Sequence, residues 1–379
     1  MAALGMIATN ASAQINLCAG NSVTGGCSSI AGGGGNTLSG GYGTIGGGGE
    51  NWIDLGEYCF IGGGAWNYVG PVFFGIVGGG EANQVYCENA VIAGGGYNSI
   101  TGLGYLCTIG GGNQNSIFNS DWGTIAGGQL NSVSTNAGAI GGGQENSVSG
   151  RWATISGGYQ NTASGFYSSI GGGLNNFSIG YADHVSGGGA NRANAGYGFI
   201  GGGASNTNTG PMSVIGGGEL NNSSAWYASI AGGREARADK YGQQAYAAGG
   251  FATQGDAQIS TYVLRRAITS TNLTELFLDG SSSRLTVPSG ATWTFDILVV
   301  ARNSSGQSGG YQIRGIIENV SGTTATVGTP VTTTFGEDVG SWHAAASADN
   351  TNDALLVRVT GDTSTIRWVA NVRTVEVSQ

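Results

Sequence analysis

The chain has 379 residues, of which 76 are glycine and only 4 are proline, and its formal net charge is −9. The glycines have no three-residue period and no proline partner, which excludes a collagen-like chain, and they recur in pairs at a fixed phase, which argues against disorder. Residues 1–150 contain seven acids and no lysine or arginine, so the basic stripe of a nucleic-acid binder and the basic helix of a membrane-surface protein are both missing there.

Residues 1–14 precede the first repeat and indicate a tail or attachment segment. They contain a short apolar patch and an Ala-Ser-Ala sequence like a signal cleavage site, but they lack the positively charged start of a secretory signal. A signal peptide remains the alternative. The sequence has no apolar run of about eighteen residues, so we expect no membrane insertion.

Residues 15–254 are built from the repeat Ile-x-Gly-Gly-x-x-Asn, whose isoleucine or valine recurs fourteen times from Ile30 to Ile230. With that residue as position 0, positions +2 and +3 are glycine in every copy, and the step is 15 residues from Ile125 onward and 15 to 17 before it. Weaker copies lie at both ends, as a stacked array requires. Position +6 is asparagine in thirteen copies: Asn36, Asn51, Asn67, Asn83, Asn98, Asn115, Asn131, Asn146, Asn161, Asn176, Asn191, Asn206 and Asn221.

Fifteen residues with paired glycines suit two short strands and two turns better than any helix. Apolar residues at positions 0 and +8 point inward, and stacking joins them into continuous ladders. Glycine permits tight corners, and asparagine suits turns and can form ladders between coils. We therefore predict an all-β fold, a parallel β-roll or β-solenoid of about fourteen coils, in which the asparagines are structural turn residues rather than a binding groove.

Position −3 is rich in aromatic residues, and we expect it on the face opposite the isoleucines. A stripe of exposed aromatic residues usually marks an interface, here with copies of the same chain. A row of sugar-stacking platforms is the alternative. The predicted interface residues are Tyr42, Tyr58, Phe74, Trp122, Trp152, Tyr167, Tyr197 and Tyr227.

After residue 254 the glycine pairs vanish, and eight of the thirteen basic residues appear. About nine alternating strands separated by turn clusters predict an antiparallel β-sandwich in residues 255–379. We expect this domain to bind a receptor through its turns. The candidate ligand-binding residues are Gln307, Tyr311, Asp338 and Trp342.

Catalytic motifs are sparse. His184 and His343 are the only histidines, and the five cysteines have no C-x-x-C spacing, so we expect no metal site and no cofactor. Glycan cleavage needs two carboxylates across the scissile bond.

Two acid pairs are candidates for that chemistry, Asp54 with Glu57 and Glu81 with Glu88. No repeat position holds acids in register on adjacent coils, so the sequence predicts that the chain is not an enzyme.

The repeats of residues 15–254 resemble head repeats of trimeric autotransporter adhesins and related coils in bacteriophage tail fibres. In those families three chains each wind a left-handed parallel β-roll side by side, so the resemblance implies a homotrimer. The stretch GGFATQGDAQISTYVLRR at residues 249–266 resembles the entry into C-terminal domains of phage tail fibre and spike proteins.

The resemblance implies a virion tail protein that adheres to the host cell, with the solenoid as a stiff spacer and the C-terminal domain as receptor binder. Its implied partners are other virion tail proteins and a host surface glycan or outer-membrane receptor; no nucleic acid is expected. A bacterial surface adhesin, a glycan-cleaving tailspike and a purely structural spacer are the alternatives.

Overall fold

The computed structural model describes residues 20–379, so the predicted attachment segment at residues 1–14 lies outside the described residues, as does Cys18. Residues up to Ile179 belong to one compact unit, here unit 1, and Gly180–Gln379 form a second, unit 2. Throughout residues 20–379 the chain forms strands and turns. No helix in that range is long and apolar enough to cross a membrane.

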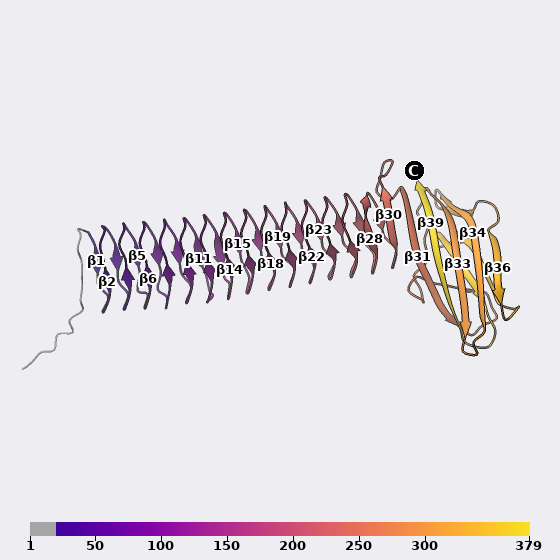
Figure 1. The fold of residues 1–379 in the computed structure, drawn as a ribbon, viewed down its shortest axis with the longest axis horizontal. Helices are drawn as coiled ribbons and strands as arrows, with labels where there is room; N and C mark the ends of the chain where they lie inside the picture. The colour runs from indigo at the N-terminus through magenta and orange to yellow at the C-terminus, as the bar shows by residue number, and fades with distance from the viewer. Residues whose placement is uncertain (1–19) are drawn as a thin grey trace, which may run out of the picture. The chain divides into compact units, whose positions relative to one another are not determined.

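Unit 1 is a stack of coils, each contributing one odd-numbered and one even-numbered strand. The odd strands are β1 (Ser22–Val23), β3 (Thr37–Leu38), β5 (Trp52–Ile53), β7 (Tyr68–Val69), β9 (Gln84–Val85), β11 (Ser99–Thr101), β13 (Ser116–Phe118), β15 (Ser132–Val133), β17 (Ser147–Val148), β19 (Thr162–Ala163) and β21 (Phe177–Ser178). The even strands are β2 (Ser29–Ile30), β4 (Thr44–Ile45), β6 (Phe60–Ile61), β8 (Ile76–Val77), β10 (Val91–Ile92), β12 (Thr108–Ile109), β14 (Thr124–Ile125), β16 (Ala139–Ile140), β18 (Thr154–Ile155) and β20 (Ser169–Ile170). Figure 1 shows the two kinds of strand alternating along the chain.

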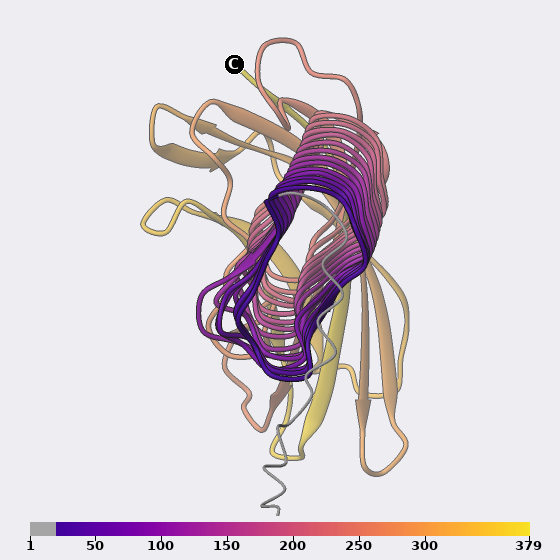
Figure 2. The same cartoon turned by 90° about the vertical axis from the view of Figure 1, so that its left-hand side faces the viewer.

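Each strand pairs in parallel with its equivalent one coil away, so equivalent side chains stack. Ile45 lies beside Ile61, and Leu38 lies beside Ile53. All four side chains are fully buried, which makes positions 0 and +8 the core of the coil. Figure 2 looks along the coils and shows that successive turns superpose.

The corners of the coil use left-handed backbone conformations. The glycine at +3 has a positive φ, for example +91° at Gly128, and a Cβ there would lie 2.1 Å from the carbonyl oxygen of Gly143 in the next coil. This position therefore requires glycine for both conformation and space. Positions +5 and −3 are also left-handed, although their residues are not glycine: φ is +56° at Leu130 and +58° at Trp122.

The asparagines at +6 close the corner from inside. Asn131 is fully buried, and its Nδ2 donates to the carbonyl oxygens of Gly127 at 3.0 Å and Gly143 at 2.9 Å. Its Oδ1 accepts from the backbone N–H of Asn146 at 3.0 Å and from that residue's Nδ2 at 3.1 Å. Its Nδ2 also donates to Oδ1 of Asn115 in the preceding coil at 3.1 Å. The side chain thus bridges three consecutive coils, and its buried polar atoms are satisfied.

We predict that Gly128→Ala destabilises the chain by about 2 kcal/mol or more, because the left-handed conformation alone costs an alanine about 1–2 kcal/mol and the added Cβ meets a carbonyl oxygen. Its neighbour Gly127 is the control, since a Cβ there meets nothing within 4 Å. Urea unfolding of both variants measures the difference. Equal destabilisation of the two would contradict this account of the corner.

Unit 2 begins with coils of the same kind and ends in longer strands. The coil strands are β22 (His184–Val185), β23 (Arg192–Ala193), β24 (Phe199–Ile200), β25 (Thr207–Asn208), β26 (Val214–Ile215), β27 (Asn222–Ser223), β28 (Ser229–Arg234), β29 (Arg237–Ala238) and β30 (Gln244–Ala248). The strands that follow are β31 (Ala257–Ile268), β32 (Thr274–Glu275), β33 (Ala291–Asn303), β34 (Ser308–Val320), β35 (Thr323–Thr326), β36 (Val331–Glu337), β37 (His343–Asp349), β38 (Ala354–Thr360) and β39 (Ile366–Ser378).

The long strands form two antiparallel sheets. The larger runs in the order β31–β39–β33–β34–β36, with β35 also beside β34 (Figure 1). The smaller contains β32, β38 and β37. Side chains from both sheets, such as Trp293, Trp368 and Val357, share one buried core. The predicted fold class, a parallel β-solenoid followed by an antiparallel β-structure, is confirmed, with about 15 solenoid turns.

Candidate functional site

The aromatic residues at position −3 lie in turns rather than on the strands. Tyr42, Tyr58 and Phe74 have φ values of +54°, +56° and +57°, and they precede the even strands. Their backbone N–H groups still donate to the neighbouring coil, for example from Tyr58 to the carbonyl oxygen of Gly41 at 3.0 Å. Their rings are about half exposed, so the side chains face outward.

Rings of successive coils stack on one another. The centroids of Tyr42 and Tyr58 are 4.8 Å apart with an interplanar angle of 5°, and Tyr58 lies 5.2 Å from Phe74. Trp152 and Tyr167 form a second pair at 5.0 Å and 4°. The spacing between parallel strands, about 4.8 Å, sets this distance. Unit 1 therefore carries flat aromatic columns on one corner.

A second aromatic cluster lies outside the odd strands. Trp52 meets Tyr68 edge to face at 5.5 Å, and Tyr68 lies 5.0 Å from Tyr86. The hydroxyl of Tyr68 donates to Asp54 at 3.1 Å; burial and this carboxylate raise the pKa of Tyr68 to about 12. Sequence reasoning missed this cluster, although aromatic residues interrupt a column that is otherwise mostly small and polar.

The two acid pairs considered for glycan cleavage differ in their placement. Glu81 belongs to the row of bridges at the glycine corner, whereas Glu88 belongs to the row at the opposite corner, so the structure does not bring this pair together. Asp54 accepts hydrogen bonds from Tyr68 and Ser39. Glu57 is exposed and, like Asp54, lies in the segment between β5 and β6.

Two of the four candidate ligand-binding residues prove to be core residues. Tyr311 is 1% exposed and Trp342 is fully buried, and the Tyr311 hydroxyl donates to Glu337 and to the carbonyl oxygen of Trp342. Burial, followed by the Glu337 hydrogen bond, raises the pKa of Tyr311. Neither side chain can reach a ligand at the surface. The prediction that Tyr311 and Trp342 lie exposed in turns is therefore wrong.

Gln307 and Asp338 lie at the surface near one end of β34. Asn303 donates to the side-chain oxygen of Gln307 at 2.7 Å, and Asp338 accepts from the backbone N–H of Ser308 at 2.7 Å. Gln307 is half-buried and Asp338 is exposed. Both therefore remain accessible candidates.

The larger sheet buries one face in the core and leaves the other open. On the open face Val263, Leu298, Val300 and Val369 are between 41% and 55% exposed. Cross-strand pairing places Val369 between Arg265 and Val300, so these side chains form one continuous patch. A continuous exposed apolar patch typically marks a surface that contacts a partner.

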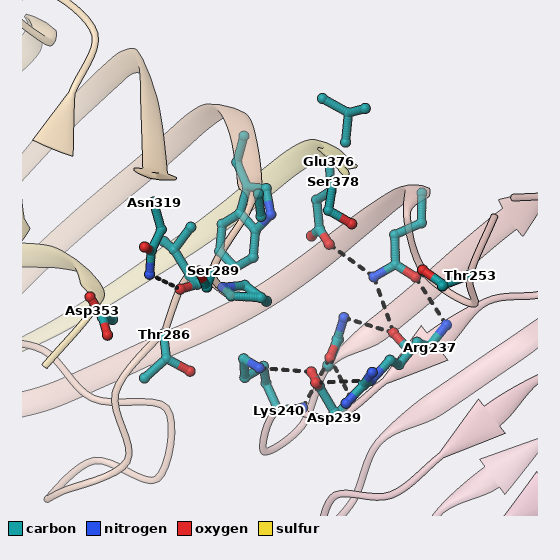
Figure 3. Close-up of a pocket in the computed structure, with 18 of the residues that line it drawn as sticks. Arg237, Asp239, Lys240, Thr253, Thr286, Ser289, Asn319, Asp353, Glu376 and Ser378 are labelled. Atoms are coloured by element: carbon teal, nitrogen blue, oxygen red, sulfur yellow. Dashed lines mark hydrogen bonds and ion pairs between the residues drawn. The ribbon is translucent and has the colours of Figure 1, made fainter. Parts of the chain in front are cut away.

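Unit 2 also contains a polar cavity of about 620 Å³ (Figure 3). Asp239 lies on one side of it, paired with Lys240 at 2.8 Å and Arg237 at 3.1 Å. Glu376 is buried and accepts hydrogen bonds from Tyr262 and Gln258, each at 2.9 Å.

The same cavity is lined by a third carboxylate, Asp353, which accepts from the hydroxyl of Thr324 at 2.7 Å. Figure 3 shows Asp353 and Asn319 on the side away from Arg237. Burial, and then the charge of Glu376, raises the pKa of Tyr262 well above its usual value. Three carboxylates, Asp239, Asp353 and Glu376, thus line one cavity, and no sequence motif marked it.

The histidines and cysteines do not gather into a metal site: among residues 20–379 no three His, Cys, Asp or Glu side chains are arranged to hold a metal ion. Cys59, Cys87 and Cys107 are buried free thiols, whereas Cys27 is exposed. Burial raises the pKa of the Cys87 thiol to about 11, which makes it a poor nucleophile at neutral pH.

No protein-family model matches the chain, and no curated protein matches it. Among solved structures it is similar to the tailspike protein gp49 of Acinetobacter baumannii bacteriophage Fri1, a capsular polysaccharide depolymerase, with 9% identity and a TM-score of 0.26 over 95% of this chain and 69% of that one. It is also similar to the tailspike protein of Acinetobacter phage vB_ApiP_P1, with 11% identity and a TM-score of 0.24 over 97% of this chain and 80% of that one.

At such identities and TM-scores the likeness assigns no activity to this chain. One of the two proteins is nevertheless a depolymerase, and this contradicts the prediction from the sequence that a chain of this kind is not an enzyme. That prediction depended on acids in the repeats alone, and it did not foresee the carboxylates of the unit 2 cavity.

Proposed function

We propose that this chain is a virion tail fibre or spike protein that attaches to the host cell surface. In this proposal the coils are a stiff spacer, and residues 255–379 bind a surface glycan. The open face of the larger sheet is the observation that carries it. Its exposed valines and leucine are supported by a complete core on the other side, so the face is rigid and available.

Attachment can be tested with the labelled full chain on a panel of bacteria. We expect Leu298→Glu to reduce cell binding by about tenfold or more. In the bound state the introduced carboxylate would be covered by the ligand and would lose its hydration, which disfavours binding. Leu273→Glu is the matched control, since Leu273 is 47% exposed and Leu298 is 41% exposed, but Leu273 precedes β32 of the smaller sheet. Unchanged binding of the Leu298 variant would rule out this face.

The aromatic columns support a further proposal, that three copies of the chain associate side by side. Stacked, half-exposed rings such as Tyr42, Tyr58 and Phe74 offer flat apolar strips that a second coil stack can cover. The remaining predicted interface residues are Trp122, Trp152, Tyr167, Tyr197 and Tyr227, all exposed.

Light scattering of the full chain should give a mass of about 114 kDa, three times the 37.9 kDa of one chain. We expect Tyr58→Asp to shift the mass toward the monomer, because aspartate tolerates the left-handed turn but cannot pack in an apolar interface. Trp66→Asp is the control: Trp66 is also left-handed and exposed, but it lies at the opposite corner. A monomeric wild-type chain would contradict the trimer and leave the columns as candidate sugar platforms.

Glycan cleavage is the second candidate function, and the unit 2 cavity favours it. Glycoside hydrolysis needs two carboxyl groups with different environments. Glu376 is buried among neutral donors, whereas Asp239 is paired with two cations.

If the cavity cleaves glycans, the wild-type chain releases reducing ends from purified host surface polysaccharide. Glu376→Gln should then lower that rate by about 100-fold or more, the usual contribution of an acid or base group. Asp362→Asn, outside the cavity, is the control and should keep full activity. Activity that survives in Glu376→Gln would exclude this cavity as the active site.

A further inference from the structure

The open face of the larger sheet carries positive charge in an otherwise acidic chain. Residues 255–379 hold eight of the thirteen basic residues, although the chain has a net charge of −9. Cross-strand pairing places five exposed arginines on this one face: Arg265, Arg302, Arg314, Arg367 and Arg373. Paired residues of an antiparallel sheet share a face, so this placement follows from the register.

Two of these arginines face each other directly. Arg302 of β33 pairs with Arg367 of β39, and like charges placed opposite each other destabilise a sheet. Within residues 20–379 neither guanidinium has an ion-pair partner; Arg302 donates to the hydroxyl of Ser308 at 3.3 Å. By contrast, Arg314 on the same face has Asp296 within 3.9 Å. The fold therefore holds uncompensated positive charge at one end of the face.

Arg265 adds a third guanidinium beside this pair. Arg265 pairs with Val369, which is two residues from Arg367 on β39. Its guanidinium donates hydrogen bonds to the carbonyl oxygens of Leu278 at 3.2 Å and Asp279 at 3.0 Å, and these bonds hold the side chain in place. Arg265 and Arg367 line a hollow of about 380 Å³.

One carboxylate, Asp279, also borders the hollow. Its oxygens accept from the backbone N–H groups of Ser281, Ser282 and Ser283 and from two serine hydroxyls, and these hydrogen bonds hold the Asp279 pKa well below its usual value. Its lone pairs are thus committed to its own loop, so it does not neutralise the arginines by direct pairing.

Taken with the proposed attachment function, on which this step rests, we infer that Arg265, Arg302 and Arg367 bind the carboxylate groups of an acidic surface polysaccharide. A guanidinium matches a carboxylate with two parallel hydrogen bonds. The neighbouring Val300 and Val369, 55% and 41% exposed, offer apolar contact to sugar rings. Nucleic acid fits less well, because a phosphate backbone requires a longer basic track than three arginines.

Binding of the full chain to polygalacturonate tests the inference, with the methyl-esterified polymer as the uncharged counterpart. We expect binding to polygalacturonate, weaker binding as salt increases, and no binding to the ester. The double variant Arg302→Gln, Arg367→Gln should lose about tenfold or more in affinity. Its melting temperature should stay equal or rise, because a like-charge pair has been removed.

Arg314→Gln is the matched control, since it lies on the same face but is compensated by Asp296, and it should keep its affinity within about threefold. Equal binding of ester and acid, undiminished binding of the double variant, or arginine-dependent binding of duplex DNA in place of polygalacturonate would each overturn the inference. If the double variant still attaches to host cells like the wild type, the inference fails while the proposed attachment function stands.

Discussion

Hydrogen bonding between successive coils is the constraint on which unit 1 depends. The backbone bonds continue from the two-residue strands into the corners, where Gln129 donates to the carbonyl oxygen of Gly143 at 2.9 Å and Leu130 to that of Asn113 at 3.0 Å. Such short strands would be marginal alone, so their stability comes from repetition. The buried asparagine at +6 completes the network with its side-chain amide, which leaves no room for a side chain at the +3 glycine. Every coil is therefore forced into the same path.

The same regular spacing organises the outside of the coils. Equivalent residues of neighbouring coils are brought within contact distance, so single exposed residues become continuous columns. Stacked rings at the −3 corner and the Gln160–Glu145 hydrogen bond of 2.7 Å at the +5 corner both arise in this way. In a left-handed turn the side chain points outward while the backbone keeps its hydrogen bonds to the neighbouring coil. A repeat that is uniform inside can thus carry different surface chemistry along its length.

Unit 2 shows how the parallel ladder is ended. β30 pairs in parallel with β28 on one side and antiparallel with β31 on the other, so the open strand edge is covered rather than left free to aggregate. The connecting turn is fixed by Asp256, whose carboxylate accepts from the backbone N–H groups of Phe251, Ala252 and Thr253. These hydrogen bonds, that from Thr253 first, lower the Asp256 pKa. The antiparallel sheets that follow can then place charge and apolar groups on one face.

The period of the sequence by itself determined the coil. Isoleucine at 0 fills the core, glycine at +3 allows the tight corner, and asparagine at +6 bonds the neighbouring coils, so the conformation of each coil follows from local sequence. Antiparallel strands after residue 254 were also predictable, because alternation is a local signal. What only the tertiary structure decided is which residues meet across the fold. Trp342 resembles an exposed turn residue in the sequence, but it is fully buried and its ring lies 6.0 Å from that of Trp368 in the larger sheet. Arg302 and Arg367 are 65 positions apart in the sequence, and only the register of β33 and β39 makes them neighbours. Long-range strand pairing has no local signature, and therefore the candidate sites, unlike the coils, could not be read from the sequence.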